Sequence, residues 1–287
     1  MKQDSIIRLM SNGDLLWRTR DQAQRLNELT SDDPAVKEIP LRRDVRSLGI
    51  LLGNILKEQV GPELFESVEQ LRALAIRHRD LMKREVTVEA RENSGDDAEL
   101  MRQAARLVAQ MSVRDAYRMT KAFAIYFELA NLAETNHRKR RKRAAEVSGS
   151  GREPMPGSFR GTLLRMRDSG IGVDEALLHL SHIMAIPVFT AHPTEVARRT
   201  VLFKRRRIAS ALERLDRLPL SPAEAGRLAE IVSAEIAGLW QSDEVRRRQP
   251  IVRDEVKMGL DYYPSCLIET LPDLYEEIAA AFDDVYG

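Results

Sequence analysis

The residues best suited to catalysis lie in one short stretch around His192. An apolar run at 185–189 predicts a buried strand, and the residues after it predict the start of a helix. His192 is therefore expected at the carboxyl end of a strand, where enzymes built from strands and helices place catalytic groups. An imidazole titrates near neutral pH and the amides of a helix start attract anions, which suits chemistry on a phosphate or carboxylate. A histidine that only caps a helix or fills a core is the alternative interpretation.

Two cations, Arg198 and Arg199, follow in the early turns of the same predicted helix. Positive charge at a helix amino terminus opposes the helix dipole, so these side chains are poorly explained as helix stabilisers. An anionic substrate or an acidic partner explains them better, and we predict that both arginines bind phosphate or carboxylate. Two solvated surface arginines remain the alternative.

Four carboxylates further along the chain are predicted to support this site. Asp243 and Glu244 each precede an arginine by four residues, a spacing that favours surface ion pairs on one helix. Asp254 and Glu255 are expected to join them in a network between helices that holds the His192 loop. No metal site is predicted, because the spacing does not supply a full oxygen shell.

Two basic clusters, at 137–143 and 204–207, could contact nucleic acid or an acidic protein surface. Solvated charge near the carboxyl end of a helix, where cations are favoured, is the simpler interpretation of the first cluster. Aromatic residues do not alternate with these cations, and no known binding module is recognised, so nucleic-acid binding is disfavoured.

The overall composition narrows the class of protein. The chain has 287 residues and a net charge of +1, which gives no general argument for binding nucleic acid or membrane. A single cysteine excludes an internal disulfide. The first residues lack the apolar core of a signal peptide, and no run is long enough to span a membrane. A soluble, cytoplasmic protein is expected.

Helices are predicted for most of the chain. We expect an amino-terminal extension at 1–40, then a helical region at 41–183 that contains a flexible loop at 144–158. Residues 184–287 are expected to form a second region, which also contains helices. The fold class is thus predominantly α-helical, with one short β-strand before His192, and that strand needs partner strands which this chain does not supply.

Capping signals at Ser112 and Ser221 predict helix starts, and Gly61 followed by Pro62 predicts the turn of a helical hairpin. The polar segment at 92–99 is typical of a solvated connection. Apolar residues spaced three and four apart predict the buried faces of the helices, and the positions expected to be buried include Phe127, Val196, Thr200 and Phe203.

The stretch at 188–195, followed by two arginines, resembles the histidine signature of phosphoenolpyruvate carboxylase. Other segments resemble further motifs of that family in the same order. They lie at 41–53, 122–134, 239–246 and 254–259. Several ordered motifs make this resemblance far more specific than one short pattern.

The resemblance implies a cytoplasmic, magnesium-dependent lyase that converts phosphoenolpyruvate and bicarbonate to oxaloacetate and phosphate. In that family bicarbonate attacks phosphorus, and the resulting carboxyphosphate breaks down to carbon dioxide, which the enolate then attacks. His192 would assist the breakdown of carboxyphosphate, with Arg198 and Arg199 placed to act on the phosphate. The family fold is a barrel of eight strands amid many helices, so a partial α/β barrel is implied, and residues 184–287 would form the start of this catalytic barrel region together with helices.

The resemblance covers about the first third of the family sequence. The family's glycine-rich phosphate loop, catalytic lysine and acidic magnesium ligands are not found in this chain. This chain alone is therefore expected to be inactive. It is interpreted as a truncated copy or as one subunit of a split enzyme with a C-terminal partner chain, and a homo-oligomer is left open. Two alternatives are a non-catalytic helical scaffold that binds a partner and, least favoured, a binder of nucleic acid or an acidic partner through 137–143.

Overall fold

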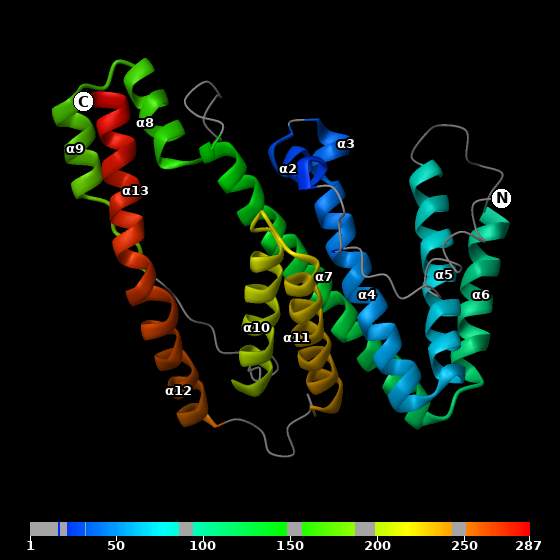
Figure 1. Ribbon diagram of the computed structural model, residues 1–287. Helices are drawn as coiled ribbons and strands as arrows, with labels where there is room; N and C mark the ends of the chain where they lie inside the picture. The colour runs from blue at the N-terminus through cyan, green and yellow to red at the C-terminus, as the bar shows by residue number, and fades with distance from the viewer. Residues whose placement is uncertain are drawn as a thin grey trace. The chain divides into compact units, whose positions relative to one another are not determined.

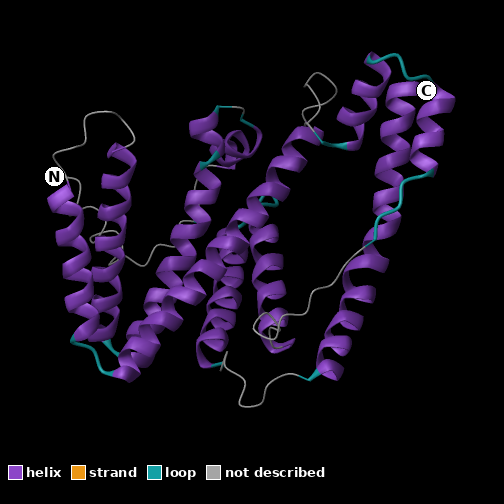
Figure 2. Ribbon diagram, turned by 180° about the vertical axis from the view of Figure 1, so that it is seen from behind, coloured by secondary structure: helices purple, strands orange, loops and turns teal. Residues whose placement is uncertain are grey.

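The computed structural model describes residue 17 and residues 22–31, 33–85, 94–147, 157–186, 199–242 and 251–287. Over these residues the chain is mostly helical and contains no strand (Figure 1, Figure 2). The predominantly helical fold class is confirmed. Of the expected strand at 185–189, Ala185 and Ile186 belong to no regular element and the rest lies outside the described residues. The strand and the partial barrel therefore stay predictions.

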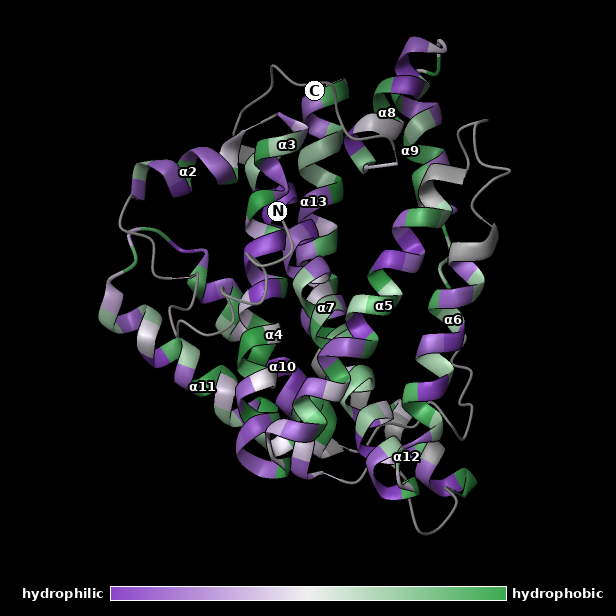
Figure 3. Cartoon of the chain, turned by 90° about the vertical axis from the view of Figure 1, so that its right-hand side faces the viewer, coloured by the Kyte–Doolittle hydropathy of each residue, from purple (hydrophilic) through white to green (hydrophobic). Residues whose placement is uncertain are grey.

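The helices carry both apolar and polar residues, as expected for helices that bury one face (Figure 3). Their bounds are α2 (Gln22–Thr30), α3 (Pro34–Lys37), α4 (Ile39–Val60), α5 (Pro62–Glu85), α6 (Ser94–Ala109), α7 (Val113–Val147), α8 (Phe159–Asp168), α9 (Val173–Ser181), α10 (Arg199–Leu215), α11 (Pro222–Gln241), α12 (Val252–Tyr262), the π-helix η1 (Tyr263–Ile268) and α13 (Glu269–Tyr286).

Two compact units divide the chain. Unit 1 contains residues 1–144 and 199–243, and unit 2 contains residues 145–198 and 244–287. The units therefore alternate along the sequence. Part of the expected extension is built into unit 1, because Trp17 and α2 pack against its core. The boundaries expected at residues 40 and 183 stay predictions.

The core of unit 1 lies among α4, α5, α7, α10 and α11. Its fully buried side chains come from apolar positions spaced three and four apart, and include Leu48, Leu52, Ile55, Ile125, Leu129, Ile208, Leu212, Leu228, Val232 and Ile236. The apolar stripes expected from the sequence are confirmed at most described positions, but Thr200 and two aromatic residues, Phe127 and Phe203, are exposed, and Val196 lies outside the described residues. Each of these two aromatic residues lies two positions from a buried residue, which places it on the opposite side of its helix.

The predicted helix boundaries in unit 1 are confirmed where a capping signal was present. Gly61 ends α4 with φ of +93°, a conformation that favours glycine, and Pro62 begins α5, so the two helices form the expected hairpin. Ser221 Oγ accepts a hydrogen bond from the amide of Glu224 at 3.1 Å. Ser112 Oγ does the same for the amide of Asp115 at 3.1 Å.

Two connections are shorter than the sequence suggested. The polar segment at 92–99 is predicted to be a solvated connection. This prediction is wrong from Ser94 onward, because α6 begins at Ser94 and packs against α5. The predicted start of the loop at residue 144 is wrong, because α7 continues to Val147. Polar and charged residues are common on the exposed face of a helix, so polarity alone did not mark these boundaries.

One prediction concerns Gly49 in the middle of α4. A Cβ atom at this position would lie 3.6 Å from Tyr126 Cε2, an ordinary contact, so Gly49→Ala should raise the stability of unit 1 by about 0.5–1 kcal/mol. A Cβ atom at Gly53 would lie 2.9 Å from Phe65 Cε2, so Gly53→Ala should raise the stability of unit 1 by less than Gly49→Ala does. Urea unfolding followed by tryptophan fluorescence measures both changes. A Gly49→Ala protein less stable than wild type would contradict this account.

A buried ion-pair network joins α4, α7 and the end of α10. Arg140 Nη2 donates to Asp44 Oδ2 at 2.6 Å, and Arg140 Nε donates to Asp216 Oδ2 at 2.9 Å. All three residues are buried. Buried charges are stable only when they are paired and hydrogen-bonded, and this guanidinium meets both carboxylates at once.

Further donors complete the network. Trp17 Nε1 donates to Asp44 at 2.9 Å, and Asn136 Nδ2 donates to Asp216 at 2.9 Å. Arg25, which is also buried, donates to the carbonyls of Trp17 and Leu215. The interpretation of the basic run at 137–143 as solvated charge is therefore wrong at Arg140. Its carboxylate partners are distant in sequence, so no local pattern identified them.

A second prediction concerns pH and His137, which lies beside this network. The Nδ1 atom of His137 is 3.0 Å from Arg140 Nη1, and because a guanidinium only donates, Nδ1 must accept. Burial lowers the pKa of His137, and Arg140 and Arg141 lower it further. The unfolded chain therefore takes up this proton first as the pH falls below about 6.5, and the stability of unit 1 should decrease.

The measurement is the unfolding free energy of unit 1 between pH 7.5 and 5.5. His137→Gln should flatten the decrease, because the side chain no longer titrates. His179→Gln, which changes an exposed histidine of unit 2, is the matched control. Equal pH slopes in wild type and His137→Gln would refute the prediction.

Unit 2 has a much smaller core. Leu163 on α8 and Ala281 and Val285 on α13 are buried against each other. Tyr286 donates its hydroxyl to the carbonyl of Ile171 at 3.1 Å, and Arg160 pairs with Asp284. These contacts hold α13 against α8, while many apolar side chains of unit 2 stay exposed.

Candidate functional site

The residues predicted to act on substrate fall at the edge of the described structure. His192 and Arg198 lie outside the described residues, as do Asp243 and Glu244. Arg199 begins α10, but its side chain also lies outside the described part. The structure therefore describes the helices that precede and follow these segments, and the contacts among the predicted site residues stay predictions.

The hairpin formed by α10 and α11 places the start of α10 and the end of α11 at the same end of unit 1. Arg214 and Glu224 pair at 3.5 Å near the connection between the helices, and Lys204 and Glu235 pair at 3.3 Å near the other end. These two pairs fix an antiparallel register in which the start of α10 at Arg199 lies near the end of α11 (Figure 1). Arg199 and Ser242, where the described residues of the hairpin begin and end, therefore lie at the same end of it.

A buried carboxylate stabilises this end of the hairpin. Glu235 accepts from Lys204 Nζ at 3.3 Å and pairs with Arg207 Nε at 2.8 Å. A Cβ atom at Gly238 would lie 2.2 Å from Lys204 Nζ, so a side chain there would displace the end of this lysine from its present position. Two cations of the basic cluster at 204–207 are therefore committed to Glu235, which weakens the case for that cluster as a docking surface.

The last residue before the acidic segment is held by α7. Lys121 Nζ donates to the backbone carbonyl of Ser242 at 2.7 Å, and Ser242 Oγ donates to the carbonyl of Gly238 at 2.6 Å. Lys121 also lies over the ring of Trp240, 5.4 Å from its centre. Two hydrogen bonds at Ser242 and the contact between Lys121 and Trp240 therefore hold the end of the chain segment that directly precedes Asp243 and Glu244 in the sequence.

The other pair of predicted supporting carboxylates belongs to unit 2. Asp254 is exposed and accepts a hydrogen bond from the amide of Ile251 at 3.1 Å, so it caps the start of α12. Glu255 lies on α12, and its side chain is outside the described part. The predicted network between these carboxylates and the His192 loop stays a prediction.

Sequence reasoning missed Lys121 and Glu235. Glu235 could have been found, because it interrupts the apolar stripe formed by Val232, Ile236 and Leu239, and a charge in such a stripe usually has a buried partner. Lys121 gives no comparable signal, since its acceptor is a backbone carbonyl that is distant in the sequence.

Neither a metal site nor a membrane-spanning helix is found in the part of the chain that the structure describes. Within the described ranges, no three histidine, cysteine, aspartate or glutamate side chains converge on a point that could hold a metal ion. No described helix combines the length and the apolar composition required to cross a membrane.

Comparison with known proteins gives one consistent result. The family model described as phosphoenolpyruvate carboxylase matches residues 41–287. Curated proteins named phosphoenolpyruvate carboxylase are similar over most of the chain. They include those of Ralstonia nicotianae, 34% identical over 249 residues, and Azorhizobium caulinodans, 35% identical over 239 residues. These alignments cover 87% and 83% of this chain but 24% of each relative, so the chain spans about a quarter of their length.

Proposed function

The chain belongs to the phosphoenolpyruvate carboxylase family, and from this premise we propose that it supplies the histidine-bearing part of a carboxylase. The proposed reaction joins bicarbonate to phosphoenolpyruvate and yields oxaloacetate and phosphate, in the cytoplasm. His192 would assist the breakdown of carboxyphosphate, either by transferring a proton or by stabilising the charge that develops. Arg198 and Arg199 would bind the phosphate oxygens.

The observation that carries this proposal is the register of the α10–α11 hairpin. It places Arg199 and Ser242, the described residues that adjoin the segments of His192 and Asp243 in the sequence, at the same end of the hairpin, and Lys121 holds Ser242. A catalytic histidine needs such a support, because a small displacement of a reacting group greatly lowers the rate. Asp243 and Glu244 are proposed to provide it.

Magnesium is implied by the family. The described side chains do not fit a magnesium site, because no cluster of carboxylates is found among them. No step is therefore assigned to the metal here, and its ligands are proposed to lie on sequence that this chain does not contain.

The exposed apolar surface of unit 2 supports the need for a second chain. Ile183, Met184 and Ile186 are 67%, 79% and 72% exposed. The helices α12, η1 and α13 add further exposed apolar residues, namely Val252, Val256, Leu260, Ile268, Leu271 and Tyr275. Large exposed apolar surfaces mark interaction sites. We propose that a C-terminal partner chain covers them and supplies strands that pair with 185–189 to complete the barrel.

The test is co-expression of this chain with a second chain that carries the missing three quarters of a family sequence. The two chains should purify together and form oxaloacetate only when bicarbonate and phosphoenolpyruvate are present. This chain alone should form none. A stable complex without turnover would instead favour the non-catalytic scaffold, for which the same exposed surface would be the binding site. Failure of the two chains to associate would overturn both proposals.

A further inference from the structure

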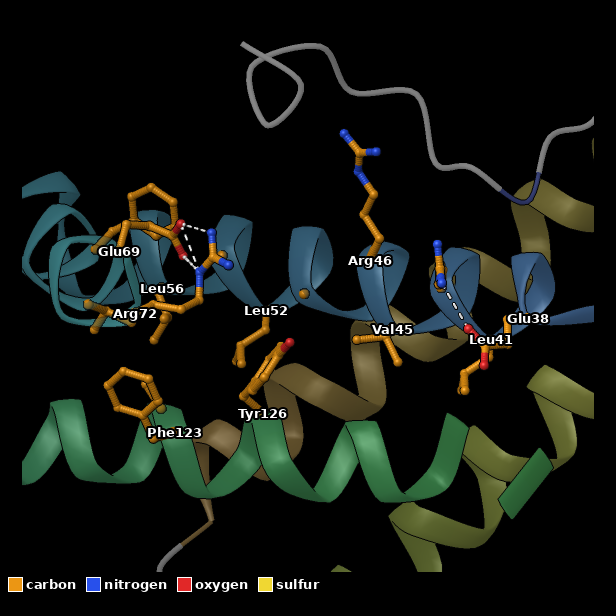
Figure 4. A pocket seen from close by; sticks show the side chains of 16 residues that line it. Glu38, Leu41, Val45, Arg46, Leu52, Leu56, Glu69, Arg72, Phe123 and Tyr126 are labelled. Carbon is orange, nitrogen blue, oxygen red and sulfur yellow. Dashed lines mark hydrogen bonds and ion pairs between the residues drawn. The ribbon is translucent and has the colours of Figure 1, made fainter. Parts of the chain in front are cut away.

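A cavity of about 620 Å³ opens in unit 1 among α4, α5 and α7, and it includes none of the proposed catalytic residues. Figure 4 shows Leu52 and Val45 reaching from α4 toward α7, where Phe123 and Tyr126 point back toward them. The volume lies within the range of about 300–1,000 Å³ that is usual for small-molecule sites.

The floor of the cavity is apolar. Its lining includes Leu41, Val45, Leu52, Leu56, Phe65 and Phe123. Gly49 also lines it and leaves space on α4, because a Cβ atom there would meet only the ring of Tyr126. An apolar chain or ring of a ligand would therefore replace water against hydrocarbon surface, which is favourable.

The rim of the cavity is positively charged. Three arginines and two glutamates line it, and each glutamate already pairs with an arginine. Glu38 accepts from Arg42 at 2.8 Å, and Glu69 accepts from Arg72 at 2.7 Å. Arg46 is exposed and extends outward from α4 (Figure 4), and among the described side chains no carboxylate pairs with it.

We propose that this cavity binds an amphiphilic anion, with an apolar chain or ring on the floor and a carboxylate or phosphate at the rim beside Arg46. A guanidinium recognises either head group by charge-assisted hydrogen bonds. The apolar floor selects against small hydrophilic anions, because they would leave it in contact with water. The proposal is independent of carboxylase activity.

The experiment is calorimetric titration of the full chain with three probes: decanoate, decyl phosphate and the neutral decanol. At least one of the two anions should bind with saturation, and more tightly than decanol. Arg46→Glu should weaken binding of the anions about tenfold or more, through lost attraction and new repulsion, and leave decanol unchanged. Arg138→Glu is the matched control, because this exposed arginine of α7 does not line the cavity. The preferred head group identifies which anion the rim accepts.

Filling the cavity tests its apolar part. Gly49→Leu should abolish binding of all three probes, since the new side chain occupies the floor. As a measurement that needs no variant, a decanoate carrying a photoreactive diazirine should label α4, α5 or α7. Absence of saturable anion binding, labelling elsewhere only, or anion affinity unaffected by Arg46→Glu would each overturn the proposal.

Discussion

Replacing Arg140 with methionine is expected to lower the free energy of unfolding of unit 1 by about 3–5 kcal/mol. Methionine keeps much of the apolar length of the arginine but removes the charge. Asp44 and Asp216 would then be buried without the cation that pairs with both at 2.6 and 2.9 Å. Neutral donors would remain near them, together with two more distant cations, Arg143 at 3.8 Å and Arg25 at 4.0 Å from Asp216.

Tryptophan fluorescence reports on the unfolding of unit 1 and not on that of unit 2. The chain has two tryptophans, Trp17 and Trp240, and both are buried in unit 1. Trp17 also donates to Asp44, so its emission reports on the network directly. Urea unfolding of wild type and Arg140→Met gives the difference in free energy.

The matched control is Arg138→Met, two residues away on the same helix. Arg138 is exposed and lies 3.8 Å from Glu134, and such surface pairs contribute about 0–1 kcal/mol. Burial raises the pKa of Asp216 and Arg140 opposes this shift, so the deficit of Arg140→Met should shrink at lower pH as that carboxylate becomes protonated. Equal losses in the two variants would show that the network does not stabilise the fold.

The sequence predicted the helices of unit 1 because their signals are local. Apolar residues spaced three and four apart predicted the buried faces, and Gly61, Ser112 and Ser221 predicted helix boundaries that the structure confirms. Each signal depends on neighbours within about one turn, so it can be read without knowing the fold.

The buried polar contacts could not be predicted in the same way. Arg140 lies in a run of cations that is typical of a solvated helix end, and only the packing of α4 and α10 brings Asp44 and Asp216 to it. Lys121 and Ser242 are likewise distant in sequence. Partners of this kind depend on which helices become neighbours, and no local spacing encodes that.

The predicted site around His192 is recognised from a sequence motif. The motif around His192 identified the family, and the comparisons confirm that membership. The roles of His192, Arg198 and Asp243 are proposed from the sequence motifs. What the structure adds is the common end of the α10–α11 hairpin from which both segments continue.

Replacing His192 with asparagine in the complex of this chain with its proposed C-terminal partner is expected to lower oxaloacetate formation by about 10²–10⁴-fold. Asparagine keeps hydrogen-bonding groups of similar size but cannot take up or release a proton near neutral pH. If His192 acts only after carboxyphosphate has formed, phosphate release should fall much less than oxaloacetate formation. Both products are therefore measured in the same reaction.

The control for this variant is His182→Asn, which changes an exposed histidine at the end of α9 and should leave both products unchanged. The His192→Asn complex should still purify intact, because the surfaces proposed to hold the partner do not include this side chain. An equal loss of phosphate and oxaloacetate would place His192 in the first half of the reaction. Unchanged formation of both would remove it from catalysis and leave the helix start at Arg199 as the remaining candidate for anion binding.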